Sequence, residues 1–158
     1  MAHGGSKISS WAWLRAVVDR ADTQATAVGW GPDAGVLILG PSGAGKSSLA
    51  LQLMQAGAQL VGDDRVTLGR GDSGAYALAI AGPGWGLVES RGVGILKAEP
   101  LRAARLKLVV DLNHTETARL PERRVTMVRG VPVPVAFGPV TPHFPISIKL
   151  WVLHGRHA

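Results

Sequence analysis

Hydrophobic positions follow two different spacings along this chain, and each spacing predicts a different element. The apolar run 36–39 is short, branched and uninterrupted, which is typical of a buried strand. Residues 48–56 carry their apolar side chains at helical spacing, and Gly57 then offers a helix-ending residue. Because 31–35 is a turn sequence, the weakly alternating residues 23–30 and the strand 36–39 are predicted to form a β-hairpin.

The rest of the chain continues as short strands followed by a final helix. Further strands are predicted at 59–61, 66–68, 76–80, 105–111, 125–128 and 131–135. Pro132 and Pro134 lack amide donors, so they favour an edge strand for the last of these. A helix is predicted within 142–153, and Pro145 fits only its first turn. Residues 1–8 are predicted to be a disordered lead and 9–21 an amphipathic helix.

A phosphate-binding P-loop is predicted between strand 36–39 and the helix that follows it. Its residues are Gly40, Pro41, Ser42, Gly43, Ala44, Gly45, Lys46 and Ser47, which satisfy G-x-x-x-x-G-K-[ST]. The glycines let backbone amides turn toward phosphate oxygens, and the helix N-terminus adds partial positive charge. Lys46 can reach the outer phosphates, and the Ser47 hydroxyl can hold Mg²⁺. Strand, loop and helix occur in the order that an ATP site requires.

Two acidic motifs are candidates for the same site. Asp63 and Asp64 follow strand 59–61, and neighbouring side chains of an extended chain point opposite ways, so one of the two is expected to face the nucleotide. The alternative is a solvated turn held by Asx-type hydrogen bonds. Glu89 and Arg91 lie in the glycine-rich residues 82–94, which fit either a mobile loop that contacts a metal or phosphate or an ordinary flexible connection.

A third acid and a cluster of arginines leave a different enzyme open. Asp111 ends strand 105–111 and resembles the Walker B acid that holds Mg²⁺ through water. Arg119, Arg123 and Arg124 are concentrated in 114–124, where one guanidinium could stabilise a transferring phosphoryl group and the others form a solvated surface. With Asp111 as Walker B and the arginines as a lid, the chain would be a generic small-molecule kinase.

Composition narrows the class of protein. The 158 residues suit one domain over 9–158 and are too few for a multidomain transporter ATPase or a helicase. The absence of cysteine excludes disulfides and thiolate metal sites. The net charge is +6, but the basic residues are scattered along the chain. An ATP site together with an acidic partner therefore explains the excess of positive charge better than nucleic-acid binding does. No apolar run approaches the roughly 20 residues of a membrane span, so we expect a cytoplasmic protein without a membrane partner.

The motifs together resemble a known family. The run GVLILGPSGAGKSSLALQLMQAGAQLVGDDRVTL, followed by VESRGVGIL, is similar to the catalytic domain of HPr kinase/phosphorylase, which phosphorylates a serine of the phosphocarrier protein HPr. The similarity is greatest to short alphaproteobacterial forms that lack the family's N-terminal domain. It implies an α/β fold with a P-loop-containing mixed β-sheet and flanking helices, related to phosphoenolpyruvate carboxykinase. It also implies ATP and Mg²⁺ as cofactors, an HPr-type carrier of the phosphotransferase system as partner, and a homo-oligomer, which is a hexamer in the family.

The resemblance also implies roles for individual residues. Asp63 falls on the family's catalytic carboxylate, which takes the serine proton in the kinase direction and returns it in reverse. Arg91 falls in the family's catalytic loop, and Arg119 falls on a catalytic arginine that precedes leucine. The implied catalytic residues are therefore Asp63, Lys46, Arg91 and Arg119, and the implied metal ligands are Ser47 and Glu89.

Two positions depart from the family pattern. Gln24 stands where the family has a catalytic histidine, and an amide cannot exchange protons. A weak natural enzyme, an inactivating substitution and a dispensable histidine are all compatible with this, and so is a nucleotide-binding regulator that senses ATP without turnover. The family's Arg-Pro-Gly-Arg loop for dephosphorylation is absent, and 141–143 stand near its place. The kinase direction is therefore expected over the phosphorylase direction.

Overall fold

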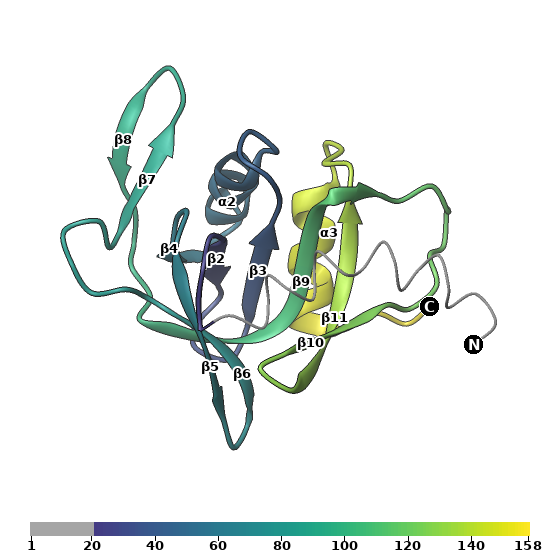
Figure 1. Ribbon diagram of the computed structural model, residues 1–158. Coiled ribbons are helices and arrows are strands. Elements are labelled where there is room, and N and C mark those ends of the chain that lie inside the picture. Colours follow the sequence, from purple (N-terminus) through teal and green to yellow (C-terminus); the bar gives the residue numbers. More distant parts are fainter. Residues whose placement is uncertain (1–20) are drawn as a thin grey trace.

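In the part of the chain that the structure describes, a curled mixed sheet has two helices packed on one face. The computed structural model describes residues 21–158, so the lead at 1–8 and the body of the helix predicted at 9–21 lie outside the described residues. A nine-stranded sheet forms the body, and a separate two-stranded hairpin projects from one end of it (Figure 1). This arrangement confirms the predicted α/β class with a mixed sheet and flanking helices. Neither helix of the described part has the length and apolar character needed to cross a bilayer.

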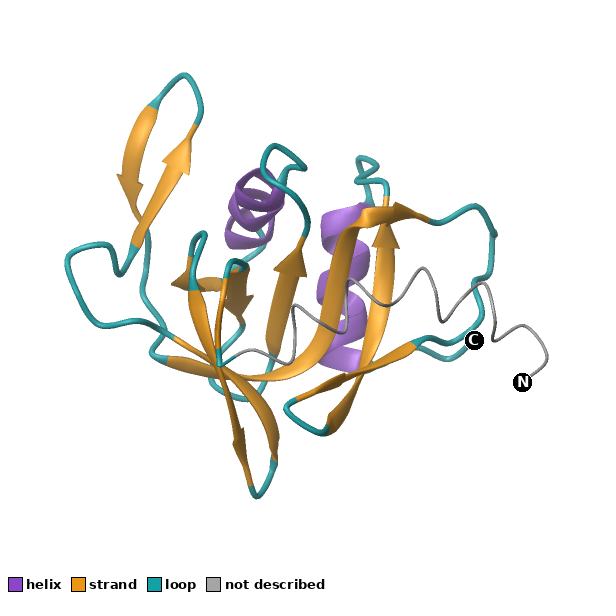
Figure 2. Cartoon of the chain, in the orientation of Figure 1, coloured by secondary structure: helices purple, strands orange, loops and turns teal. Residues whose placement is uncertain are grey.

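The elements follow the predicted order, with strands predominating (Figure 2). The strands are β1 (Asp22–Thr23), β2 (Thr26–Gly29), β3 (Gly35–Leu39), β4 (Gln59–Gly62), β5 (Val66–Gly71), β6 (Gly74–Leu78), β7 (Leu87–Ser90), β8 (Gly94–Lys97), β9 (Ala103–Thr115), β10 (Val125–Val128) and β11 (Val131–Gly138). The helices are α2 (Lys46–Gln55) and α3 (Phe144–His154). In the large sheet the order is β1-β5-β6-β9-β3-β2-β4, with β11 also paired to β9 and β10 paired to β11.

The long strand β9 connects the parts of the sheet. Its first residues pair antiparallel with β6, and the following residues pair in parallel with β3 on one side and with β11 on the other. β2 pairs antiparallel with β3, which confirms the predicted hairpin that leads into the P-loop. The last pair in the ladder between β3 and β9 is Leu39 with Asp111, so the P-loop starts at this edge of the sheet.

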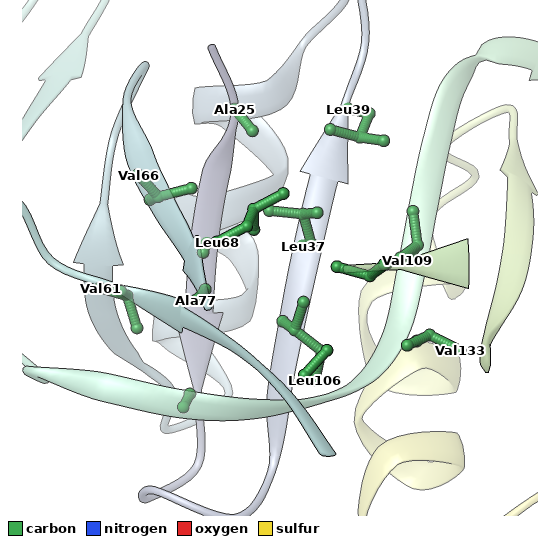
Figure 3. Close-up of a cluster of buried hydrophobic side chains, with 14 of the residues drawn as sticks. Ala25, Leu37, Leu39, Val61, Val66, Leu68, Ala77, Leu106, Val109 and Val133 are labelled. Carbon is green, nitrogen blue, oxygen red and sulfur yellow. The ribbon is translucent and has the colours of Figure 1, made fainter. Parts of the chain in front are cut away.

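β3 is buried on both faces because its alternate side chains enter two different cores. Val36 and Ile38 belong to the core beneath the helices, together with Leu49 of α2. Leu37 and Leu39 belong to a second core, which lies inside the curl of the sheet (Figure 3). A shift of β3 by one residue relative to its neighbouring strands would exchange these two sets of side chains. Packing on both faces therefore fixes the register of β3 and, with it, the position where the P-loop starts.

β11 is not the edge strand that its prolines predict, because it pairs with both β10 and β9. The Val135 amide donates to the Arg124 carbonyl at 2.9 Å, on the side of β10. The nitrogens of Pro132 and Pro134 therefore face the other side, where β9 pairs only from Val135 onward. The prolines remove no hydrogen bond from either ladder, which is why an interior strand tolerates them.

The glycine-rich residues 82–94 contain more regular structure than a mobile loop. β7 and β8 form an antiparallel hairpin in which Glu89 pairs with Ile95. Gly92 and Gly94, with φ of 85° and 140°, supply the backbone conformations of the turn. Residues 87–94 are therefore held in a regular β-hairpin by the pairing of β7 with β8. The hairpin lies beside α2 (Figure 1).

Candidate active site

The P-loop has the backbone conformation that phosphate binding requires. Gly43 and Gly45 have φ of 83° and 98°, and a Cβ built on either would meet no atom within 4 Å. These glycines are therefore needed for their backbone angles, and they keep the inner side of the loop uncovered. The Lys46 ammonium donates to the carbonyl oxygens of Gly40 and Pro41 at 2.8 and 3.2 Å, which holds it across the loop.

A cleft of about 490 Å³ opens between the P-loop, the turn after β4 and the β7–β8 hairpin. It is lined by Thr26, Ser42, Gly43, Gly45, Lys46, Ser47, Ser48, Leu51, Asp63, Asp64, Glu89, Ser90 and Arg91. Most of the residues singled out in the sequence thus meet in one place, although they come from segments that lie far apart in the chain. Arg119 and Asp111 do not line this cleft.

The carboxylate of Asp63 contacts three of the segments that form the cleft. The Ser47 hydroxyl of the P-loop donates to Asp63 Oδ1 at 2.7 Å, and the Thr26 hydroxyl of β2 donates to the same oxygen at 3.1 Å. The Glu89 amide of β7 donates to Asp63 Oδ2 at 3.3 Å. An acid is therefore held directly against the hydroxyl that the sequence predicts to bind Mg²⁺. The catalytic role of this acid stays a prediction.

Asp64 also lines the cleft, so both acids of the pair border it, and the expectation that one of them faces the nucleotide stays a prediction. β4 ends at Gly62, and Asp64 has φ of 72°, so the chain is not extended here and the alternation of a strand does not apply. Gln24 donates to Asp64 Oδ1 at 3.4 Å. The residue that departs from the family pattern is thus a neighbour of the acid pair.

Thr26 is a cleft residue that sequence reasoning missed. It is fully buried and belongs to no motif, and a threonine at the start of a strand is ordinary in any sheet. It reaches the acids because β2 pairs antiparallel with β4, with Ala27 opposite Gly62. No local signal in the sequence could have shown this contact, because it depends on pairing between strands that are separated by β3 and α2.

Asp111 has a different environment from the cleft acids. Its register with Leu39 is the one that a Walker B acid requires, but its side chain is buried away from the cleft. The carboxylate accepts a hydrogen bond from the Asn113 amide at 2.9 Å and pairs with His114, whose ring stacks on Phe137. The geometry thus favours Asp63 over Asp111 as the acid beside the P-loop, and the small-molecule kinase with Asp111 as Walker B gains no support.

The donors of the cleft fit nucleotide phosphates and Mg²⁺. Ser47, Asp63 and Glu89 contribute oxygen atoms, which are the ligands that Mg²⁺ prefers. Lys46 and Arg91 contribute positive charge from opposite walls of the same cleft. Mg²⁺ in kinases is held by one or two protein ligands together with substrate phosphates, so Ser47 and Glu89 are a sufficient protein contribution.

Comparison with protein families identifies the chain. A model described as the HPr Serine kinase C-terminal domain matches residues 32–142, which is more than half of the chain. The chain belongs to the HPr serine kinase family. The matched range begins before β3 and ends before α3, so it contains every residue of the cleft except Thr26. The resemblance noted in the sequence is thereby confirmed.

Individual relatives of this HPr kinase family domain agree with the family model. The chain is 39% identical over 129 residues to the HPr kinase/phosphorylase of Aromatoleum aromaticum, and this match covers 73% of this chain and 41% of that protein. The chain is also 38% identical over 111 residues to the HPr kinase/phosphorylase of Bordetella pertussis, and this match covers 63% of this chain and 36% of that protein. The chain thus spans about two fifths of the length of the curated relatives that it matches.

A solved structure shares the fold. The Hpr(Ser) kinase/phosphatase from Coxiella burnetii superposes with a TM-score of 0.67 at 24% sequence identity, over 83% of this chain and 87% of that chain. The mixed sheet with its P-loop is therefore the fold of an HPr kinase, as the sequence predicts.

Arg119, which the family resemblance predicts to be catalytic, lies outside the cleft of this HPr kinase family member. It is exposed on the segment between β9 and β10, which runs down the side of the sheet away from α2 (Figure 1). The ends of that segment are joined by an ion pair between Glu116 and Arg124. Glu116 also accepts hydrogen bonds from the amides of Thr117 and Ala118, each at 3.2 Å. This ion pair shapes the segment that presents Arg119.

Opposing effects act on the pKa of Glu116. Burial by itself raises the pKa, but the hydrogen bond and charge of Arg124 and the amides of Ala118 and Thr117 outweigh burial. The pKa therefore lies below its ordinary value of 4.5. A carboxyl group whose pKa is lowered on folding stabilises the folded state at pH values above its pKa in the unfolded state. This contribution is lost as the pH falls through its pKa in the folded state.

We expect the Glu116 carboxylate to stabilise the protein only while it is ionised. At pH values above 4.5 the wild type should have a larger free energy of unfolding than Glu116→Gln, and this difference should shrink as the pH falls below 4.5. Urea unfolding of both proteins across this range measures the difference. Asp72→Asn, an exposed substitution on the turn between β5 and β6, is the control. A difference that stays constant to low pH would contradict the expectation.

Proposed function

We propose that this domain is an ATP- and Mg²⁺-dependent serine kinase that phosphorylates an HPr-type phosphocarrier protein of the phosphotransferase system. The observation that carries the proposal is the 2.7 Å hydrogen bond between Ser47 of the P-loop and Asp63. It puts a carboxylate at the end of the P-loop where the transferred phosphate would lie. Relatives named HPr kinase/phosphorylase support the choice of an HPr-type carrier over a small molecule.

The P-loop side of the cleft would bind the nucleotide. Amides around Gly43 and Gly45 would cradle the phosphates, and Lys46 would move from the loop carbonyls to the outer phosphate oxygens. Mg²⁺, when bound, supplies positive charge that is shared among the phosphate oxygens. Ser47 and Glu89 would hold it through their side-chain oxygens, because both residues line the cleft beside Asp63, which the Ser47 hydroxyl and the Glu89 backbone amide contact.

The opposite side of the cleft would carry out the transfer. Asp63 takes the proton of the carrier's serine hydroxyl while the serine oxygen bonds to the γ-phosphorus and the bond from that phosphorus to the ADP oxygen breaks. Phosphoryl transfer has a loose transition state, so the protein contributes mainly by positioning groups and neutralising charge. Arg91, on the β7–β8 hairpin, faces the cleft and can supply this charge.

A transfer assay tests the proposed function directly. Purified protein, Mg²⁺ and γ-labelled ATP are incubated with an HPr-type carrier in its wild-type form and with its target serine replaced by alanine. We expect label on the wild-type carrier alone, and added inorganic phosphate then tests the reverse reaction. ATP binding without any labelled carrier would refute the kinase and favour a nucleotide-binding regulator, and Gln24→His would then show whether the family's histidine restores transfer.

Asp63→Asn should separate chemistry from binding. An amide cannot accept the serine proton, so we expect transfer to fall by about a hundredfold or more, while the Kd for ATP changes little. Initial rates and calorimetric titration with ATP measure the two effects. Asp72→Asn is the matched control, because Asp72 is exposed on the turn between β5 and β6. Equal losses of transfer and ATP affinity would argue against a role as general base.

The identity of the metal-binding acid can be tested with a pair of substitutions. Glu89→Gln should raise the Mg²⁺ concentration for half-maximal transfer by about tenfold or more, because it weakens a direct ligand. Asp111→Asn should leave that concentration unchanged, because Asp111 pairs with His114 outside the cleft. Mg²⁺ titrations of the two variants give the comparison, and the opposite pattern would restore Asp111 as the Walker B residue.

A further inference from the structure

The hydroxyl of Thr26 connects the two acids of the cleft. Thr26 is the first residue of β2 and has no solvent exposure. Its hydroxyl donates to Asp63 Oδ1 at 3.1 Å and accepts a hydrogen bond from the Asp64 amide at 3.4 Å. A hydroxyl has one hydrogen and two lone pairs, so it can make both bonds at once. One buried group is thus bonded to the side chain of Asp63 and to the backbone of Asp64.

The turn that carries the acids has an unusual backbone conformation. Asp64 has φ of 72°, in the left-handed region that side chains disfavour. Such a residue persists where its surroundings hold it in place. Thr26 binds the Asp64 amide, and Gln24 donates to the Asp64 side chain at 3.4 Å. Thr26 at the start of β2 and Gln24 just before it therefore both support the turn, and Thr26 is the buried one of the two.

The two carboxylate oxygens of Asp63 have different surroundings. Oδ1 accepts hydrogen bonds from Thr26 and Ser47, which occupy both of its lone-pair directions. Oδ2 accepts a longer bond of 3.3 Å from the Glu89 amide, on the exposed side of the carboxylate. A carboxylate oxygen has room for a second donor, so Oδ2 can receive another hydrogen from the cleft.

We propose that Thr26 is a positioning residue that orients Asp63 so that Oδ2 receives the serine proton. This inference rests on the proposed kinase function, and it deepens it by assigning the reacting oxygen. Ser47 cannot replace Thr26 in this role, because its oxygen is also the expected Mg²⁺ ligand. Without the Thr26 hydroxyl, Asp63 can rotate about its terminal bond, and the Asp64 amide loses its partner.

Substitutions at Thr26 test the role of the hydroxyl separately from the role of shape. Thr26→Val keeps the shape and removes the hydroxyl, whereas Thr26→Ser keeps the hydroxyl and removes a methyl group. We expect Thr26→Val to lower kcat for carrier phosphorylation by about tenfold or more with the KM for ATP unchanged, and Thr26→Ser to stay within about threefold of the wild type. Thr126→Val is the matched control, because Thr126 is buried on β10, which pairs with β11.

Two kinetic outcomes would overturn the proposal. A Thr26→Val variant with wild-type kcat would show that the hydroxyl is not needed. A loss of kcat that Thr26→Ser shares, together with a matching loss of thermal stability in both, would show that Thr26 only supports packing. Thermal melting of all four proteins therefore accompanies the kinetics.

A second measurement does not depend on phosphoryl transfer. Amide hydrogen exchange at Asp64, followed by NMR, reports the bond that Thr26 accepts. Exchange should be faster by about tenfold or more in Thr26→Val and close to wild type in Thr26→Ser. Unchanged exchange in Thr26→Val would refute the bridge even in an active enzyme. If the wild type transfers no phosphate, the proposed function and the assignment of Oδ2 fail together, and the exchange data alone decide whether Thr26 holds the turn.

Discussion

The parallel pairing of β3 with β9 is the contact on which the rest of the structure depends. β3 is buried on both faces, so its side chains lock it between the core under the helices and the core inside the curl of the sheet. β9 extends before this ladder to pair with β6, and on its other side it pairs in parallel with β11. The P-loop leaves the edge where the ladder ends, at Leu39 and Asp111, so its position is set by two packed cores.

The cleft combines a local motif with walls that the tertiary structure supplies. The P-loop and the start of α2 are continuous in sequence, and together they carry the backbone geometry that is typical of a phosphate site. The acids arrive on the turn after β4, and Glu89 and Arg91 arrive on the β7–β8 hairpin. The carboxylate of Asp63, on this turn, contacts Ser47 of the P-loop, the Glu89 amide of β7 and Thr26 of β2. The proposed nucleotide binding therefore needs one segment, whereas the proposed phosphoryl transfer needs four.

The sequence did not determine the directions of the acidic side chains. Asp64 lines the cleft because its positive φ turns it out of the strand geometry assumed for it. Asp111 occupies a Walker B register, but it bonds to His114 and to the Asn113 amide. In each case the residue type and its spacing mark a candidate acid, but they do not give the orientation of its side chain, which the backbone angle or nearby hydrogen bonds decide.

The sequence alone determined the elements whose causes are local. The strand at 36–39, the P-loop and the helix after it follow from apolar spacing, glycine backbone freedom and helix dipole, all within about twenty residues. Only the tertiary structure decided that Thr26 bridges the acids, and that Arg91 faces the cleft whereas Arg119 does not. These placements depend on pairing between strands far apart in the chain, and that pairing is stabilised by burying whole faces of the sheet, which no short run of residues encodes.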